Sequence, residues 1–320
     1  MNILARKQEA IYDSNLSKEE QEKRQEEFYD LYFKTRDKDE KSILGNLSLK
    51  TRQRLHKLIF GVFIIKNKLS GFSCDVLKDE RNNTDRPVIF APTHVGKFDI
   101  EVSAIGIKDH FYLLSGDYEN LQGIIDGKFL MLNGVLFFNE NVKSDRVSIA
   151  QKMITHLKSG GNLMFFPEGA WNLKPELPVL PLYWGIIDIA QKSNAIIVPV
   201  AIEQYGKKFK VNIGKNFDPQ LFGSEDAERV RATEELRNIL ATLKWEIWET
   251  EPQLKRDELQ SNMWDNYVNS RISEWNFTVE HIENLIFKPK DVCVYTEVFA
   301  HIKNLIPSHK TAFLFNQSNK

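Results

Sequence analysis

Cysteine is scarce in this 320-residue chain, which contains only Cys74 and Cys293. Two isolated thiols make no disulfide framework, and they lack the Cys-x-x-Cys spacing of a zinc site. An excess of charge is missing too, because 43 Lys and Arg residues stand against 44 Asp and Glu residues. The net charge of −1 gives no general attraction to nucleic acid, so we expect no nucleic-acid partner.

Long apolar runs are also missing. Residues 58–65 form an apolar run of eight residues, far below the ~20 that a helix needs to cross a bilayer. Residues 1–20 carry Arg6, Lys7 and Glu9 without an apolar core, which argues against a secretory signal. We therefore expect a cytoplasmic protein without a transmembrane span.

The hydrophobic content of 42% permits a substantial core, and short apolar runs alternate with helical patterns in the middle of the chain. The clearest helical pattern covers residues 145–158 and ends at Gly160-Gly161. Such alternation predicts an α/β fold with a largely parallel, mixed sheet flanked by helices. The predicted strands are residues 72–76, 88–91, 111–114, 135–138, 163–166, 196–201 and 209–213.

Both ends of the chain have helical patterns instead. Ser17 to Glu20 is a candidate capping box, and an aromatic cluster follows at residues 28–33. That cluster either packs on the body of the protein or contacts a partner or membrane. Beyond residue 220 we expect helices at residues 224–249, 257–271, 279–287 and 297–306, and a short strand at residues 312–315.

Residues 58–65 are bracketed by Arg52, Arg54, His56 and Lys57 before them and by Lys66 and Lys68 after them. A basic, amphipathic segment can lie in the headgroup plane of a membrane, but an ordinary core helix has the same pattern. We divide the chain accordingly. The predicted parts are a charged helical arm (1–48), a membrane-associating segment (49–71), an α/β domain (72–220) and a helical region (221–320).

The first chemical motif follows the predicted strand at residues 88–91. His94 comes after Pro92, and Asp99 stands five positions later. A carboxylate can hold a histidine in one tautomer, which leaves the other ring nitrogen free to take a proton from a hydroxyl. With seven histidines in the chain, this pairing could also arise by chance.

The second motif is Pro167-Glu168-Gly169, which follows the apolar run at residues 163–166. By itself the tripeptide is an ordinary turn. If both apolar runs belong to one parallel sheet, however, their carboxyl ends bring His94 and Glu168 to the same edge, where open α/β sheets bind ligands.

These two motifs resemble the first and third sequence blocks of the glycerolipid acyltransferase family, which includes the 1-acylglycerol-3-phosphate (lysophospholipid) acyltransferases. Residues 134–138 stand where the second block falls, and residues 196–200 resemble the fourth. The order and approximate spacing of all four blocks match over about residues 77–215. The ends of the chain lie outside the resemblance.

The resemblance implies an O-acyltransferase of phospholipid biosynthesis that works at the membrane surface. His94 would act as general base and Asp99 would orient it. The acyl donor would be acyl-CoA or acyl-carrier protein, with no tightly bound cofactor or metal, and the oligomeric state stays open. The candidate substrate-binding residues are Lys97, Asn139, Arg146, Pro167, Glu168 and Gly169.

The chain departs from the family where a phosphate would bind. Family members that use lysophosphatidate usually carry an arginine at the end of the second block and another after the third, but here these places read Asn139-Glu140-Asn141 and Ala170-Trp171-Asn172. Lys97, Lys143, Arg146 or Lys174 could supply a cation instead. The sequence favours acyl transfer to a lysophospholipid or similar lipid hydroxyl. A catalytically silent membrane-binding relative and a thioester or ester hydrolase are the alternatives.

Overall fold

The computed structural model describes residues 3–11, 16–174, 177–273 and 278–288. The chain divides into two compact units, residues 1–286 and residues 287–320, and the helices and strands of the described residues belong to the first. The helix predicted at residues 297–306 and the strand predicted at residues 312–315 lie outside the described residues.

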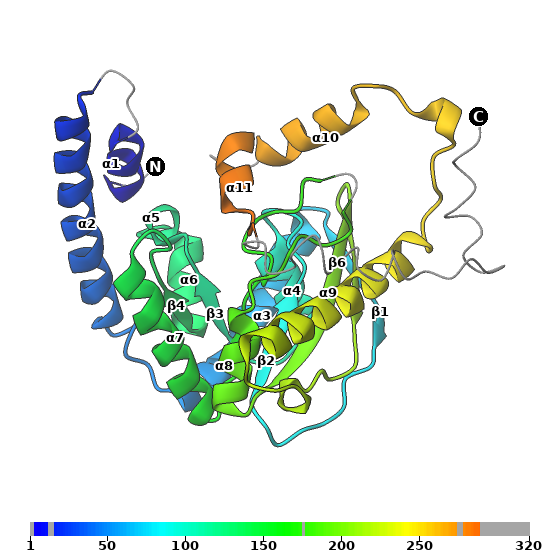
Figure 1. The fold of residues 1–320 in the computed structure, drawn as a ribbon, viewed down its shortest axis with the longest axis horizontal. Coiled ribbons are helices and arrows are strands. Elements are labelled where there is room, and N and C mark those ends of the chain that lie inside the picture. Colours follow the sequence, from blue (N-terminus) through cyan, green and yellow to red (C-terminus); the bar gives the residue numbers. More distant parts are fainter. Residues whose placement is uncertain (1–2, 12–15, 175–176, 274–277, 289–320) are drawn as a thin grey trace. The chain divides into compact units, whose positions relative to one another are not determined.

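In the described part of the chain, the strands form one seven-stranded sheet in the order β1-β7-β6-β2-β5-β3-β4 (Figure 1). All neighbouring pairs are parallel except β6 and β7, which pair antiparallel through a hairpin. This confirms the predicted mixed sheet, and each predicted strand overlaps an observed one. The strands are β1 (Ser73–Asp79), β2 (Val88–Pro92), β3 (Tyr112–Ser115), β4 (Val135–Phe137), β5 (Leu163–Met164), β6 (Ile196–Tyr205) and β7 (Lys208–Ile213).

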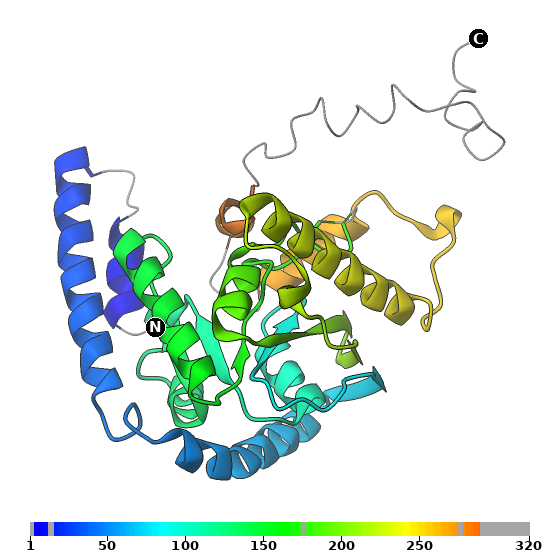
Figure 2. The same ribbon diagram turned by 60° about the horizontal axis from the view of Figure 1, so that its bottom comes forward.

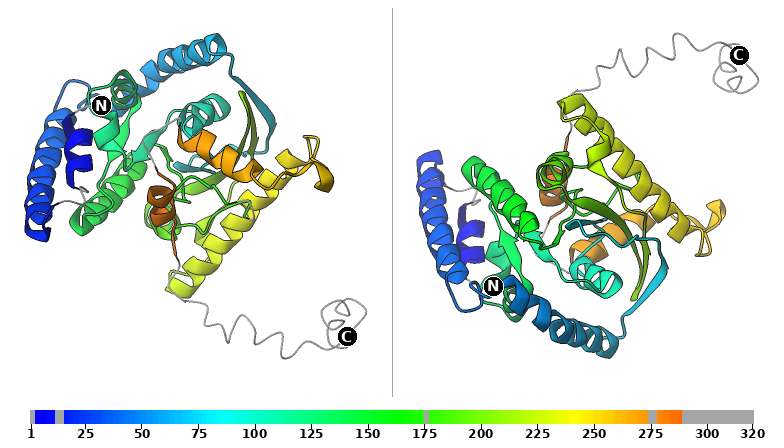
Figure 3. Two further views of the ribbon diagram at one scale, coloured as in Figure 1. Left: turned by 90° about the horizontal axis from the view of Figure 1, so that it is seen from above. Right: turned by 90° about the horizontal axis from the view of Figure 1, so that it is seen from below.

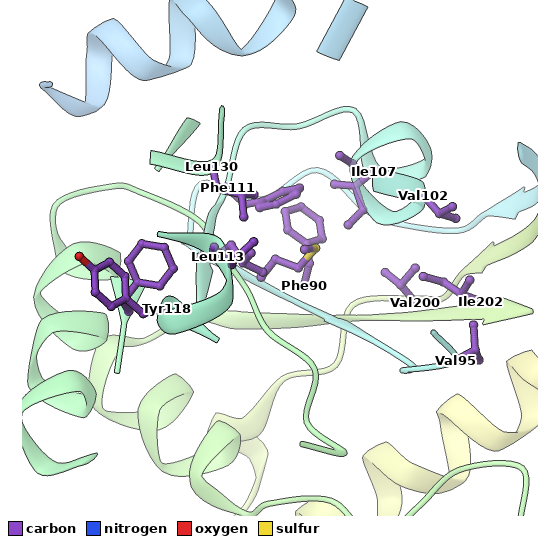
Figure 4. Close-up of a cluster of buried hydrophobic side chains, with 14 of the residues drawn as sticks. Phe90, Val95, Val102, Ile107, Phe111, Leu113, Tyr118, Leu130, Val200 and Ile202 are labelled. Atoms are coloured by element: carbon purple, nitrogen blue, oxygen red, sulfur yellow. The ribbon is translucent and has the colours of Figure 1, made fainter. Parts of the chain in front are cut away.

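Side chains of the central strands alternate between two apolar layers, because successive residues of a strand point to opposite faces. Phe90 packs with Phe111 and Leu113 on one face, which Figure 4 shows in close-up. Ile89 and Ala91 join the other layer. The first layer is covered by α4 (Asp99–Ile107), α5 (Tyr118–Leu121) and α6 (Ile125–Asn133), and α3 (Leu49–Leu69) packs on α4 and α6.

The second layer lies under α7 (Lys143–Lys158), α8 (Gly185–Ser193) and α9 (Asp226–Trp248). Figure 2 shows the sheet between α9 on one side and α3 on the other. The predicted helix at residues 145–158 is α7, and its buried residues Ile149, Met153 and Leu157 recur every four positions. Helical periodicity therefore placed this element correctly.

The amino-terminal arm packs on the body of the protein. Ser17 and Glu20 form the predicted capping box at the start of α2 (Lys18–Glu40), which lies beside α1 (Ile3–Ile11). Tyr32 is fully buried, with its ring edge-on to Tyr118 at 5.2 Å. Of the two interpretations of the aromatic cluster, packing on the body is confirmed.

The carboxyl-terminal region is more irregular than predicted. The expected helix at residues 257–271 is replaced by a 3-10 turn (Arg256–Glu258), an irregular stretch and α10 (Met263–Ile272). The helix α11 (Val279–Leu285) agrees with the prediction for residues 279–287, and a further 3-10 turn covers Pro219–Leu221. In the view from above, α10 and α11 (orange) lie in front of the strands (Figure 3, left).

Candidate active site

The candidate residues gather at the edge formed by the carboxyl ends of the parallel strands. His94 follows β2, and Glu168 follows its neighbour β5. The register pairs Phe90 with Met164, and carrying the same offset of 74 residues along the chain sets His94 opposite Glu168. The parallel sheet thus brings the two sequence motifs together, at the separation of adjacent strands, ~4.8 Å.

His94 and Asp99 form a hydrogen-bonded pair. The ring Nδ1 lies 2.7 Å from Asp99 Oδ2, and the backbone N–H groups of Val95 and Gly96 donate to the same oxygen at 2.6 and 2.9 Å. Because this oxygen accepts from two amides already, the short contact with the ring is a hydrogen bond only if Nδ1 carries the proton. The Nε2 atom is then left as an acceptor.

Burial separates the two members of the pair. The Asp99 side chain is 1% exposed, whereas that of His94 is 20% exposed. Asp99 is the first residue of α4, so its carboxylate also lies at the positive end of the helix dipole. The imidazole can therefore meet a substrate while its partner stays out of water.

Aromatic rings hold the imidazole from two sides. Phe166 stacks on the His94 ring with centroids 4.1 Å apart and planes inclined by 18°, and Trp171 meets it edge-on at 6.2 Å. Both residues belong to the loop after β5. The sequence predicted neither contact, although Phe166 and Trp171 flank the Pro167-Glu168-Gly169 motif.

Glu168 is fully buried, and its two oxygens bind backbone amides. Oε1 accepts from the His94 N–H at 2.8 Å, and Oε2 accepts from the Leu180 N–H at 2.7 Å. Burial raises the pKa of Glu168, an effect that Lys244 and these two amides oppose. Glu168 was expected to accept hydrogen bonds from an acceptor hydroxyl, but in this structure both of its oxygens are occupied by the protein. It positions the His94 backbone.

Gly169 and Pro167 shape the turn rather than offering a polar group. Gly169 has φ +70°, and a Cβ on it would lie 2.4 Å from the Tyr183 ring. The Pro167 carbonyl accepts from the Tyr183 N–H at 2.9 Å. Only glycine fits this backbone, which explains why the motif ends in that residue.

Thr93 positions the loop before His94 through contacts that sequence reasoning did not identify. Its buried hydroxyl donates to the Ile202 carbonyl at 3.2 Å and accepts from the Ile202 N–H at 2.9 Å. These bonds fix the loop before His94 to β6, on the side opposite β5. No local pattern in the chain signals them, because the two residues are 109 positions apart.

Three other candidate residues are Lys97, Asn139 and Arg146. Lys97 is exposed, with Nζ 5.7 Å from the centre of the Phe98 ring. Asn139 is buried after β4, where its N–H donates to Asp145 at 2.6 Å. Arg146 is exposed and donates to the Glu140 carbonyl. These three residues are at the same edge of the sheet, and the contacts just given are with groups other than the His94–Asp99 pair.

The stretch after Gly169 is a packed connector. Trp171, Leu173 and Leu180 are buried together with Val268 of α10 and Ile282 of α11. The Asn172 N–H donates to the His94 carbonyl at 2.8 Å, so this stretch also contacts the first motif. Among the described residues, no group of three or more His, Cys, Asp or Glu side chains could hold a metal ion.

The geometry supports base chemistry on a hydroxyl or a water molecule. The neutral imidazole, oriented by Asp99, can accept a proton at Nε2 and become an imidazolium that the carboxylate stabilises. The amides of Val95 and Gly96 are already bonded to Asp99, so they are not available to stabilise an oxyanion. Another group must supply that stabilisation.

Parts of the chain are similar to known proteins. Residues 74–203 match the family described as Acyltransferase. A stretch of 86 residues is 33% identical to an uncharacterized acyltransferase of Schizosaccharomyces pombe, and it spans 26% of this chain and 30% of that protein. The crystal structure of PlsC, the 1-acyl-sn-glycerophosphate (LPA) acyltransferase of Thermotoga maritima, is similar with a TM-score of 0.49 and 20% identity, over 72% of this chain and 91% of that one.

Proposed function

We propose that the protein is an O-acyltransferase of the glycerolipid acyltransferase family, and the match of residues 74–203 to the family described as Acyltransferase supports this. It moves a fatty acyl group from acyl-CoA or acyl-carrier protein to a hydroxyl of a lysophospholipid or similar lipid. The observation that carries the proposal is the 2.7 Å contact between His94 Nδ1 and a buried Asp99 carboxylate, beside a turn that holds the His94 backbone.

The reaction begins with proton transfer to His94. As the acceptor hydroxyl gives its proton to Nε2, its oxygen attacks the thioester carbonyl carbon, and a C–O bond forms. The negative charge moves to the carbonyl oxygen. Asp99 stabilises the imidazolium that results, and Phe166 keeps the ring in place.

The tetrahedral intermediate then collapses. The C–S bond breaks, the thiolate leaves, and the imidazolium returns its proton to sulfur, so that the products are the acylated acceptor and the free thiol. A thiolate is a good leaving group, and direct transfer therefore needs no nucleophilic side chain of the enzyme. No cofactor enters any of these steps.

We also propose that the protein binds membranes through α3. Its buried face carries His56, Ile59 and Phe63. The opposite side presents the α3 stripe, which is Leu58, Val62, Ile65 and Leu69 with exposed fractions of 69, 44, 61 and 84%. Exposed cations at Arg54, Lys57 and Lys68 adjoin the stripe, a combination that suits anionic headgroups above an acyl boundary.

The stripe ends beside the catalytic edge. Lys66 of α3 bonds Glu101 at 2.6 Å, and Glu101 is in the first turn of α4, two residues after Asp99. Lys66 also lies 3.7 Å from Asp126 of α6, next to Ile125, which is 70% exposed. Contact with a lipid surface at this place would bring lipid substrates close to His94. None of the helices in the described segments is long and apolar enough to cross a bilayer.

The function is tested by thiol release from acyl-CoA in the presence of a panel of lysolipids, followed by identification of the products. We expect His94→Ala to reduce the rate at least 10³-fold, because direct transfer then has no base. His281→Ala, a change of an exposed histidine on α11, serves as the control and should leave the rate unchanged. Unaltered thiol release by His94→Ala would refute the proposal, and free fatty acid in place of acylated lipid would identify a hydrolase.

A further inference from the structure

Arg271 is a buried cation close to the catalytic loop, although it belongs to α10 and lies outside the acyltransferase match at residues 74–203. It is 5% exposed. Its guanidinium packs over the Tyr267 ring at 5.0 Å and donates to two oxygens of Gln204, the side-chain Oε1 and the backbone carbonyl. Gln204 belongs to β6, where that strand runs past the end of β2.

Within the described segments, Arg271 has no acidic partner for its charge. Among the described residues, no carboxylate lies within 4.0 Å of its guanidinium. Glu203 precedes Gln204 in β6. Its carboxylate is bound by Trp248 at 2.7 Å and by Lys244 at 3.5 Å. A buried charge is normally paired, because leaving it unpaired in a protein interior is costly.

Arg52 shows what a buried arginine with a purely structural role looks like in this protein. It is 3% exposed, and its guanidinium donates to five backbone carbonyls, those of residues 44, 45, 47, 131 and 132. An arginine has five N–H donors, so Arg52 is saturated. Among the described groups, Arg271 donates to Gln204 twice and interacts with the Tyr267 side chain, which leaves donors for an additional ligand.

The position of Arg271 points to a ligand at the reaction centre. A Cβ on Gly96, in the loop between His94 and Asp99, would lie 3.9 Å from Arg271 Nη1 and 3.8 Å from Gln204 Oε1. The guanidinium thus touches the catalytic loop where glycine leaves the backbone bare. Asp99 does not neutralise it directly, because among the described residues the ion pair of Asp99 is with His94.

We propose that Arg271 binds a phosphate group of a substrate at the edge of the His94–Asp99 loop. The inference rests on the proposed acyl transfer, in which both the lipid acceptor and coenzyme A can carry phosphate. A guanidinium with free donors recognises phosphate through paired hydrogen bonds. Arg271 would replace the phosphate-binding arginines that are missing after β4 and after Gly169, where the chain has Asn139-Glu140-Asn141 and Ala170-Trp171-Asn172.

The experiment measures binding by calorimetric titration of the full chain, with no turnover needed. The probes are sn-glycerol 3-phosphate, coenzyme A, inorganic phosphate and, as the neutral match, glycerol. We expect at least one organic phosphate to bind, and Arg271→Gln to weaken it about 10- to 100-fold, the usual loss for a charged hydrogen-bonded contact. Arg271→Lys should bind the organic phosphate with an affinity between those of the parent and Arg271→Gln, because lysine retains the charge but not the paired N–H donors of the guanidinium.

Arg52→Gln is the matched control, since it removes an equally buried arginine whose hydrogen-bond partners are backbone carbonyls. It should lower the melting temperature without changing phosphate binding. Preference for sn-glycerol 3-phosphate would assign the site to the acceptor, and preference for coenzyme A would assign it to the donor. In turnover, Arg271→Gln should raise KM for that substrate, and kcat should stay within about threefold.

The proposal is overturned if the parent protein binds no organic phosphate, if inorganic phosphate binds equally well, or if Arg271→Gln and Arg52→Gln weaken binding alike. It is also overturned if Arg271→Lys binds no better than Arg271→Gln. If the protein still transfers acyl groups while any of these results is obtained, only the proposed role of Arg271 is refuted. Phosphate binding through Arg271 without acyl transfer removes only the proposed function.

Discussion

Asp99 receives three hydrogen bonds on one oxygen, from the His94 ring and from the amides of Val95 and Gly96, whereas its other oxygen is buried and has no hydrogen-bond partner among the described residues. The carboxylate therefore folds its own loop as well as orienting the histidine. This dual use follows from the short spacing. His94, Val95 and Gly96 precede Asp99 by only three to five residues, so they can reach its side chain only if the loop forms a tight turn. Catalytic orientation and loop structure are inseparable at this residue.

Glu168 is the corresponding residue of the second loop, and its replacement gives a residue-scale prediction. In Glu168→Gln, one carboxylate oxygen becomes an NH₂ group that faces the N–H of His94 or Leu180, so two donors oppose each other. We expect unfolding to require about 1–3 kcal/mol less free energy and kcat to fall about 10-fold or more. Urea titration and steady-state thiol release measure the two effects.

A matched variant separates this effect from loss of charge in general. Glu22→Gln changes an exposed carboxylate of α2 that lies 4.0 Å from Lys18, and it should alter stability by less than about 0.5 kcal/mol. If Glu168→Gln retains both the parental kcat and the parental stability, Glu168 does not position His94. Recovery of activity by Glu168→Gln at low pH would also contradict this geometry. Protonation cannot turn the glutamine NH₂ group into an acceptor for the backbone N–H that it faces.

At this scale, the sequence revealed only what lies close along the chain. The His94–Asp99 pair was predictable, since both residues belong to one loop. The Thr93–Ile202 bonds and the contact of Arg271 with Gly96 join segments more than 100 residues apart, and nothing local marks them. Glu168 was predicted at the right place with another role, because burial of its carboxylate depends on the connector at residues 177–182.

Among the elements, α3 combines two interpretations that its sequence left open. One face is a core face, with His56 bonded to Asn133 and Phe63 packed beside Phe129, and the other carries the exposed α3 stripe. A water-soluble helix normally exposes polar residues on its outer face. The apolar outer face of α3 and the cations beside it are the observations behind the proposed contact with a lipid surface.

We predict that the double substitution Ile65→Asp with Leu69→Asp releases the protein from vesicles. Both side chains are more than half exposed, so folding should be little affected, whereas two carboxylates would face anionic headgroups. Sedimentation with vesicles of phosphatidylglycerol and phosphatidylcholine should show at least a 10-fold loss of binding. Val147→Asp, a change of a 66% exposed residue on α7, is the control and should bind like the parent.

High salt should weaken the binding of the parent as well, because the cations contribute through screened electrostatics. Equal sedimentation of the double variant and the parent would show that α3 is not the contact. If the protein binds pure phosphatidylcholine vesicles as well as anionic ones, Arg54, Lys57 and Lys68 do not contribute to membrane binding through their charge.

The strands were the most predictable elements, and the carboxyl-terminal helices the least. Strand prediction succeeded best for the central strands β2, β5 and β6, because each is an apolar run between loops that is buried on both faces of the sheet. The predicted helix at residues 257–271 was wrong in its first half. Leu254 and Leu259 are 58 and 59% exposed, so no buried face stabilises a helix there, and propensity alone does not suffice.

Across the whole molecule, the two edges of the sheet have opposite pKa shifts. At the carboxyl edge, burial raises the pKa of Asp117 and of Glu140 to about 7 each. At the amino edge, burial and the neighbouring His56 and His156 lower the pKa of His110 to about 4. Acidification therefore destabilises the native state through His110 and stabilises it through Asp117 and Glu140. The two effects oppose each other, so the pH dependence of the total stability shows neither one separately.

A difference measurement reveals the contribution of the acids. Between the ordinary pKa of 4.5 and the native value of about 7, native Glu140 holds a proton that the unfolded chain has lost. The stability of the parent therefore falls through this contribution as pH rises through that interval. Glu140→Gln has no charge to bury, and its free energy of unfolding should exceed that of the parent by about 2 kcal/mol at pH 8.

The advantage of Glu140→Gln should shrink toward pH 5, where Glu140 is neutral in the native protein as well. His110 is present in both proteins and cancels in the difference, whereas Asp117 adds to it with the same sign, because Glu140 is one of the groups that raise its pKa. Urea unfolding of both proteins at pH 5, 6, 7 and 8 measures the difference. A constant difference over this range would mean that the Glu140 carboxylate is solvated in the native protein.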